Sequence, residues 1–361
     1  MRLEDKIILA RHVDMQSNLI EFEGESARQL FLLYSAAKAR IVKRLKGLKK
    51  GSIHTRKQQL QLLAEVEETL QGLVKIMAAR VAEHAVTAHK FAAAEVGNIL
   101  SWDGAVKGFN LAALSTPQII AIVAAQKFGD KQLDGWLMSM FGEGLDRVKA
   151  EIATGKVRGL SYKNLVKSII DMLGGSEIRR HLDAIVRSYV QKMAALAARM
   201  VVEANKEVVN ELEWSAVMEG ASFDTGRGTC IRCAALDGSR YKNYGAAPAI
   251  PLHLRCRCML LPVTKSWLDL GINADDMTEK TSKWYNRDYP SRKILDYGYT
   301  DKNYGEWWAS MPASFRRNAI GPRRTELIDK GVLSFDDLVD HKTGRLFTID
   351  ELEAKHGKVQ G

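Results

Sequence analysis

Apolar residues recur at intervals of three and four near the start of the chain. Within residues 27–48 they fall on one face of a helix. This stripe consists of Leu30, Leu33, Ala37, Ile41 and Leu45. Gly24, Glu25 and Ser26 come directly before it. We therefore expect a leading segment up to residue 26, followed by one amphipathic helix.

A second and longer stripe covers residues 55–96. Its apolar positions alternate three and four residues apart, as in a heptad seam. They are Leu63, Val66, Leu70, Leu73 and Met77. A helix of this length is typical of an extended hairpin or a coiled-coil arm. The same stripe would also suit a long helix in the core of a bundle, and the sequence leaves both open.

Residues 98–220 contain further helical patterns interrupted by glycine. The run Ser115-Thr116-Pro117-Gln118 indicates a helix start, because proline is favoured in the first helical turn. The expected helices span residues 117–127, 131–153, 160–173 and 176–220. The last of them has an apolar side typical of a core face, formed by Ile185, Tyr189, Met193, Leu196 and Met200.

The pattern changes near residue 221, where turn-forming residues replace the helical stripes. Residues 258–263 are mostly apolar and are typical of a short strand. Four of the seven tryptophans follow the strand, in a tail with little periodicity: Trp267, Trp284, Trp307 and Trp308. Such a tail either packs along an existing body or a partner, or forms a small core of its own.

Charge adds a candidate interaction surface. The chain of 361 residues has a formal net charge of +10, which suggests a polyanionic neighbour such as nucleic acid. Residues 38–57 contain nine basic side chains and no acid. The candidates for phosphate contacts are Lys43, Arg44, Lys46, Lys49 and Lys50. A solvated helix end explains the same run better, because no aromatic side chains alternate with the basic ones to stack on bases. No apolar run reaches the length of a membrane helix, and we expect no signal peptide.

All four cysteines and one histidine lie within residues 230–258. The spacing is C-x2-C, then nineteen residues, then H-x2-C-x-C. A C-x2-C turn presents two thiolates to one ion, and Zn²⁺ takes four such ligands in a tetrahedron. The candidate ligands are Cys230, Cys233, His253, Cys256 and Cys258. Cys256 and Cys258 would share one face of a strand. A turn at residues 251–253 would instead join His253 to Cys256, so the choice of four stays open.

Other chemistry would suit the cysteine cluster less well. Disulfides require an oxidising compartment, and inert core thiols would be scattered along the chain. A catalytic zinc keeps one coordination position open beside a general base. Asp237 is near in sequence, but Asp237-Gly238 is typical of a tight turn. We therefore expect a structural Zn²⁺ and no enzymatic activity.

Together these patterns predict a mainly α fold. A long helical arm and a helical bundle are followed by a small zinc-stapled α+β module with an aromatic-rich tail. The expected segments are a helical arm (1–97), a helical domain (98–220), a cysteine-rich zinc-binding module (221–265) and a C-terminal wrapping tail (266–361).

A family signature is visible in the runs CIRCAALDG and PLHLRCRC. They resemble the signature of the phage Mu F-like minor head protein family, also described as head morphogenesis proteins. The matching positions are Cys230, Cys233, Gly238, Pro251, His253, Cys256, Arg257 and Cys258. A later stretch resembles the family's C-terminal segment through Trp307, Pro312, Arg316, Gly321 and Arg324. The resemblance covers residues 160–350 and says little about the first 150.

The resemblance implies a structural virion component at the portal vertex that assists head assembly, DNA packaging or genome delivery. Its partners would be the portal protein, other head proteins and packaged DNA. It would be located in the virion head, and in the host cytoplasm during assembly. Two other functions stay open: a zinc-containing nuclease with His253 as base, and a nucleic-acid-binding protein built on a zinc knuckle.

Overall fold

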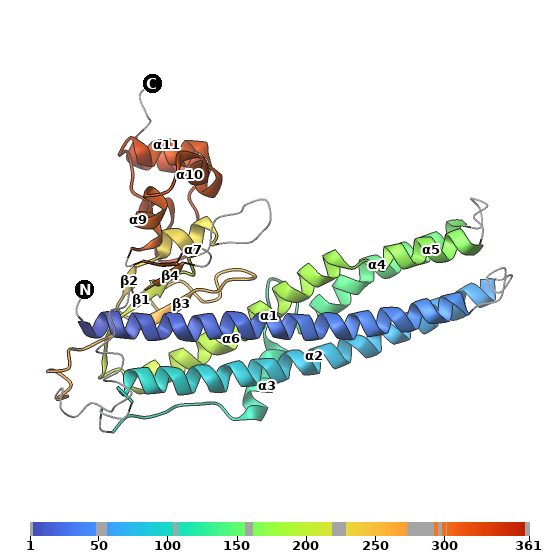
Figure 1. The fold of residues 1–361 in the computed structure, drawn as a ribbon, viewed down its shortest axis with the longest axis horizontal. Coiled ribbons are helices and arrows are strands. Elements are labelled where there is room, and N and C mark those ends of the chain that lie inside the picture. Colours follow the sequence, from blue (N-terminus) through green and yellow to red (C-terminus); the bar gives the residue numbers. More distant parts are fainter. Residues whose placement is uncertain are drawn as a thin grey trace. The chain divides into compact units, whose positions relative to one another are not determined.

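The computed structural model describes residues 3–47, 56–103, 106, 108–155, 162–218, 229–272, 292–294, 298–300 and 302–357. It is mainly helical (Figure 1), with a small sheet, a cysteine–histidine group and an aromatic cluster near the C-terminus. The fold class expected from the sequence is therefore confirmed. In chain order the elements are α1 (Leu3–Lys46), α2 (Arg56–Leu100), α3 (Thr116–Ala125), α4 (Leu133–Gly155), α5 (Tyr162–Met172), α6 (Ser176–Ala204), β1 (Val209–Ser215), α7 (Ile231–Leu236), β2 (Arg240–Tyr241), β3 (Met259–Thr264), β4 (Arg292–Ile294), β5 (Gly298–Thr300), α9 (Tyr304–Ala309), α10 (Ala313–Ile320), α11 (Pro322–Asp329), η2 (Asp336–Leu338) and α12 (Ile349–His356).

Packing groups the chain into two compact units, each assembled from separated segments. Unit 1 contains Met1–Leu19, His89–Ala113 and Gln191–Gly361, and unit 2 contains Ile20–Ala88 and Leu114–Val190. The helices α1, α2 and α6 each contribute to both units. The four segments expected from the sequence stay a prediction.

Unit 2 is a helical bundle in which α1 and α2 run antiparallel (Figure 1). Tyr34 of α1 stacks on Phe141 of α4 with ring centroids 5.7 Å apart, and its hydroxyl donates to the carbonyl of Leu173. Lys38 Nζ donates to the carbonyl oxygen of Gly174 at 2.6 Å. Because α1 packs against other helices here, its apolar stripe serves as part of a bundle core.

The seam expected on α2 is buried, with one difference in register. Val66, Leu70, Leu73 and Met77 are all buried. Leu63 is only half-buried, and Leu62 takes the core position in its place. The stripe is therefore the inner face of a bundle helix, which was one of the two alternatives left open by the sequence.

The leading segment expected before residue 26 is wrong. The helix α1 begins at Leu3 and passes through Gly24 to Lys46. A glycine costs a helix only about 1 kcal/mol relative to alanine, and the apolar stripe continues upstream through the buried Ile8, Met15 and Leu19. The burial of that upstream stripe outweighs the single weak position.

The start of α1 is anchored within unit 1. The guanidinium of Arg11 donates two hydrogen bonds to the carboxylate of Asp103, at 2.9 and 3.2 Å, and both side chains are almost fully buried. Asp103 lies just beyond the end of α2, so the pair fixes the two helices to each other. A bidentate pair of this kind adds geometric specificity as well as energy.

The helix α6 ends at Ala204, whereas the sequence analysis extended it to residue 220. Asn205 explains the difference, since its side chain bonds to the backbone and competes with helical continuation. Its Nδ2 donates to the carbonyl oxygens of Val201 and Asn110, both at 2.7 Å. The chain then continues as β1, where the buried Leu212 and Trp214 alternate with half-buried Glu211 and Glu213.

The strand β1 is the centre of an antiparallel sheet with the order β2-β1-β3. Leu212 lies opposite both Tyr241 of β2 and Pro262 of β3. The strand β3 confirms the prediction for residues 258–263, shifted by one residue. Within the described chain β3 pairs on one side only, which tolerates the missing N–H of Pro262.

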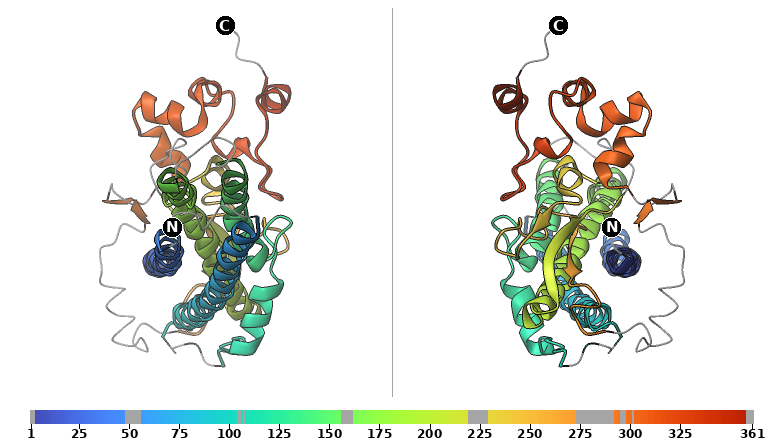
Figure 2. Two further views of the ribbon diagram at one scale, coloured as in Figure 1. Left: turned by 90° about the vertical axis from the view of Figure 1, so that its right-hand side faces the viewer. Right: turned by 90° about the vertical axis from the view of Figure 1, so that its left-hand side faces the viewer.

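The C-terminal segment forms a small aromatic core. Tyr304, Trp307 and Trp308 of α9 are buried and contact Phe335 or Phe315 through ring faces and edges. The helices α9, α10 and α11 lie together in Figures 1 and 2. The part of the tail from α9 onward therefore has a core of its own. Trp267 instead packs edge-on against Trp102, just beyond the end of α2, with ring centroids 5.1 Å apart, and Trp284 lies outside the described residues.

None of the helices that the structure describes has both the length and the apolar character needed to cross a bilayer.

We expect Leu70→Asp to lower the free energy of unfolding by about 3 kcal/mol or more, because it removes apolar burial and places a charge in the seam. Ile76→Asp is the matched control, since Ile76 lies on the same helix but is 54% exposed. Thermal and urea unfolding measure both variants. Equal stability of the two variants would show that the seam is not a core contact.

Candidate metal centre

Cys230 and Cys233 are positioned by the short helix α7. Cys230 is the N-cap residue in extended conformation, and its Sγ accepts a hydrogen bond from the backbone N–H of Cys233 at 3.5 Å. Both thiols therefore lie at the first turn of the helix. Cys233 is buried and Cys230 is half-buried, so one side of the pair remains close to solvent.

His253, Cys256 and Cys258 come from the irregular segment between Pro251 and the start of β3. The backbone N–H of Cys256 donates to the carbonyl oxygen of His253 at 3.1 Å, closing a turn that brings the two residues together. Arg255, inside this turn, has a φ of 64°. The expected strand geometry for Cys256 and Cys258 is wrong, because β3 begins only at Met259.

The side chains of the two segments meet in one cluster. His253 Nε2 lies 3.0 Å from Cys230 Sγ and 3.2 Å from Cys233 Sγ, and the Sγ atoms of Cys233 and Cys256 are 3.8 Å apart. Cys258 forms a second group with Cys233 and Cys256, within 4.8 Å. All four cysteines are free thiols. All five sequence candidates are thus brought together, and the cluster can hold a metal ion.

Contacts within the cluster favour negative charge on two of its sulfurs. Hydrogen bonding from the Cys233 thiol, aided by His253, lowers the pKa of Cys230 to about 5. Hydrogen bonds from Cys233 and Cys258 lower the pKa of Cys256. The pKa of Cys233 is raised, because its thiol donates to Cys230. Such thiolates attract a metal cation. A bound cation would also displace the protons from the neighbouring thiols, because a cysteine binds metal as the thiolate.

The imidazole of His253 is oriented by a backbone contact. Its Nδ1 bonds to the carbonyl oxygen of Leu254 at 2.7 Å, so Nε2 faces the sulfurs. Burial alone lowers the pKa of His253, but the hydrogen bond to Cys230 and the nearby thiolates raise it to about 9. A carbonyl on the second ring nitrogen is the usual partner of a metal-ligating histidine.

The donor types, and one distance between them, match a tetrahedral thiolate site. A tetrahedron with metal–sulfur bonds of about 2.3 Å has sulfur–sulfur edges of about 3.8 Å, which matches the distance between Cys233 and Cys256. Within the described residues, neither of the two candidate groups contains a carboxylate. The arrangement therefore offers ligands without an acid–base pair.

Asp237 has a role that the sequence analysis missed. The expected tight turn is present, with Gly238 at a φ of 83°. The buried Asp237 carboxylate also accepts hydrogen bonds from the backbone N–H groups of Ala216 and Tyr304, each at 2.8 Å. It thereby connects α7 to the end of β1 and to the first residue of α9. The only signal in the sequence was an acid directly after an apolar helix.

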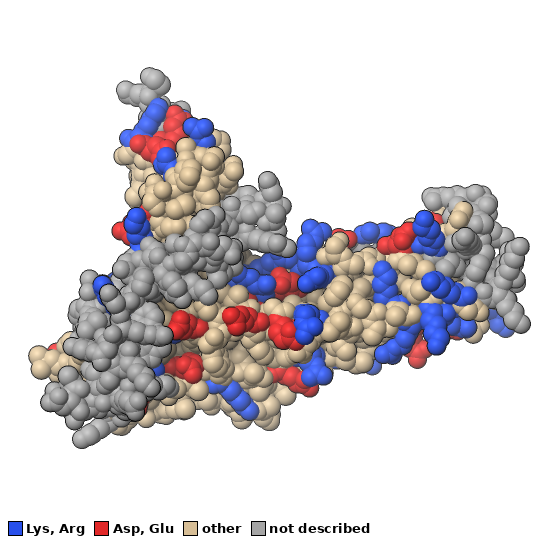
Figure 3. Space-filling model, viewed as in Figure 1, with Lys and Arg blue, Asp and Glu red and all other residues tan. Residues whose placement is uncertain are grey.

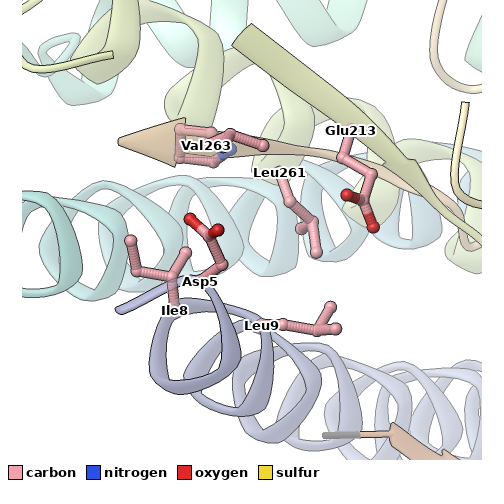
Figure 4. A pocket seen from close by; sticks show the side chains of 7 residues that line it. Asp5, Ile8, Leu9, Glu213, Leu261 and Val263 are labelled. Atoms are coloured by element: carbon pink, nitrogen blue, oxygen red, sulfur yellow. The ribbon is translucent and has the colours of Figure 1, made fainter. Parts of the chain in front are cut away.

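A separate small pocket lies between the start of α1 and the sheet of unit 1. Figure 4 shows Asp5, Ile8 and Leu9 facing Leu261 and Val263 of β3. Its walls are mostly apolar, and none of the five candidate metal ligands lines it. The pocket therefore plays no part in the metal centre.

The basic candidates lie in unit 2, at the end of α1. Lys43, Arg44 and Lys46 are exposed there, among other basic side chains visible in Figure 3. Arg44 donates to both carboxylate oxygens of Glu65, at 2.7 and 3.0 Å, so part of its charge is already balanced. Lys49 and Lys50 lie outside the described residues.

Positions of the C-terminal signature have structural contacts. The guanidinium of Arg316 lies over the ring of Trp308, with its Cζ 5.3 Å from the centroid, and also pairs with Asp329. Arg324 donates to the carbonyl oxygen of Phe347 at 3.1 Å. Comparisons of the chain with protein-family models, curated proteins and solved structures find no significant match. The comparisons therefore leave the resemblance described in the sequence analysis a prediction.

The distances predict unequal roles for the last two cysteines. We expect Cys256→Ser to weaken metal binding more than Cys258→Ser, because the Sγ atoms of Cys256 and Cys233 lie 3.8 Å apart, as expected for two thiolates on one ion. Competition with a chromophoric chelator measures both affinities, and circular dichroism confirms that each variant is folded. A larger loss in Cys258→Ser would place Cys258 in the coordination sphere instead.

Proposed function

We propose that this protein is a phage minor head protein, and that its metal centre is a structural Zn²⁺ site. The supporting observation is the convergence of the C-x2-C pair and the H-x2-C-x-C segment in one cluster of thiols and imidazole. The resemblance of this same signature to the Mu F-like family supports the biological role. In this role the protein performs no reaction.

The proposed ligands are Cys230, Cys233, His253 and Cys256, which form a continuous chain of contacts between 3.0 and 3.8 Å. Cys258 is the alternative fourth ligand. When bound, Zn²⁺ would crosslink the first turn of α7 to the segment that precedes β3. Because thiolate and imidazole ligands are soft or borderline, they favour zinc over Mg²⁺ or Ca²⁺.

The role of such a crosslink follows from what surrounds it. The helix α7 has six residues and β2 has two, so neither is stable alone. Through Asp237 the same module holds the first residue of α9, which begins the aromatic core. Metal binding would therefore supply folding free energy to the module and position the C-terminal core.

The proposed partners are the portal protein and other head proteins, at the portal vertex of the virion and, during assembly, in the host cytoplasm. Packaged DNA is a further proposed partner, through the exposed end of α1. Lys43 and Lys46 are exposed there and supply cations for phosphate contacts.

The alternative is a zinc-containing nucleic-acid-binding protein or nuclease. The basic end of α1 would also suit that function. The candidate metal groups found among the described residues contain no carboxylate that could act as a base or hold a second cation, which favours the structural role.

Chelation tests the structural role of the metal. The purified protein should contain about one zinc per chain, and its removal should expose residues 225–312 to protease while sparing unit 2. Mass spectrometry of limited digests locates the cleavage sites. Unchanged digestion after complete metal removal would exclude a stapling role, and loss of a measurable turnover would identify a catalytic zinc.

Assembly tests the proposed biological role. The protein should copurify with the portal and enter particles in few copies, and Cys230→Ser should reduce both. Lys342→Ala is the control, since Lys342 is exposed and outside the metal cluster. Quantitative mass spectrometry of purified particles measures incorporation. Normal particles that lack the protein, together with cleavage of plasmid DNA or salt-dependent binding to it, would favour the alternative.

A further inference from the structure

Two buried glutamines hold the backbone of the segment that supplies the last ligands. Gln16 of α1 donates from Nε2 to the carbonyl oxygen of Arg257 at 2.6 Å. Gln191 of α6 donates in the same way to the carbonyl oxygen of Cys258, also at 2.6 Å. Both glutamines and the metal cluster belong to unit 1. Two helices far apart in sequence thus hold consecutive peptide groups.

Burial makes these contacts informative. The exposed fraction of Gln16 is 6% and that of Gln191 is 1%. A buried amide without a hydrogen-bond partner lowers the stability of the fold by about 1–3 kcal/mol. An apolar side chain of similar size would fill the same space without this loss. Leucine and methionine are the usual residues at such positions in a helix. The amides are therefore explained by the carbonyl groups that they bind.

The carbonyl groups need these partners. Residues 255–258 lie in the irregular stretch before β3, where no helix or strand ladder is available to their carbonyl groups. Cys256 and Cys258 are buried, so water cannot readily take the place of a protein donor. Gln191 donates to the carbonyl of the candidate ligand Cys258 itself, and Gln16 donates to that of Arg257, which lies between Cys256 and Cys258.

We infer that Gln16 and Gln191 are positioning residues of the metal centre, and that Gln16 couples metal occupancy to the docking of the N-terminal part of α1. This inference rests on the proposed zinc site. The glutamines fix the backbone of residues 257–258 and thereby the direction of the neighbouring thiol. Linkage is reciprocal: if docking of α1 strengthens metal binding by some factor, metal binding strengthens docking by the same factor.

Methionine variants separate hydrogen bonding from packing. Gln16→Met and Gln191→Met keep the side-chain volume but remove the donor, and each should weaken zinc binding by about tenfold to a hundredfold. Gln29→Met is the control on α1, because Gln29 is exposed and its amide bonds, among the residues described, to Glu25 of its own helix. The visible spectrum of the Co²⁺-loaded protein should shift in the first two variants and not in the control. Unchanged affinity and spectrum in both would overturn the inference.

Hydrogen exchange of the unmodified protein tests the coupling without any variant. Zinc should slow amide exchange in residues 3–19 of α1, which share the unit of the metal centre, and leave residues 20–46 unchanged. Equal exchange in residues 3–19 with and without metal would overturn the coupling. A protein that binds no zinc at all would instead refute the proposed metal site, so the two failures are distinguishable.

Discussion

The structure of unit 1 depends on how the segment between Pro251 and β3 is held. This segment has little regular secondary structure, yet it carries three of the five candidate ligands and leads into a fully buried strand. Its side chains meet the thiols of α7, and its backbone receives hydrogen bonds from α1 and α6. Conformational entropy opposes the ordering of an irregular loop. Contacts from three directions offset that cost, and a metal would add the strongest of them.

Sequence patterns succeeded where one face of an element is buried continuously. The stripe of α2 and the proline-marked start of α3 were predicted because periodicity and capping are local properties. The same reasoning failed at Gly24 and at Asn205. Gly24 was given too much weight as a helix breaker against the apolar stripe around it. Asn205 was given too little weight as a residue that ends a helix. The shift from Leu63 to Leu62 has a similar origin, since adjacent leucines satisfy the same helical period.

The sequence could predict which side chains gather in the candidate site, but it could not predict the residues that hold their backbone in place. Cysteines at C-x2-C spacing can be recognised as candidate metal ligands from the sequence alone, because cysteine is rare and a cluster of cysteines is conspicuous. Gln16 contacts a residue 241 positions away, and Gln191 one 67 positions away. Asp237 reaches Tyr304 across another 67. No local pattern encodes such distances, and an isolated glutamine on a helix is usually a solvated residue.

The C-terminal signature gains a physical meaning from these contacts. Arg316 lies over Trp308 while pairing with Asp329, and Arg324 binds the backbone of Phe347. These arginines hold the small aromatic core together, and a core of this size has little apolar area with which to do so alone. The cysteine signature and the arginine signature then perform related tasks, since Asp237 joins the module of the first to the core of the second.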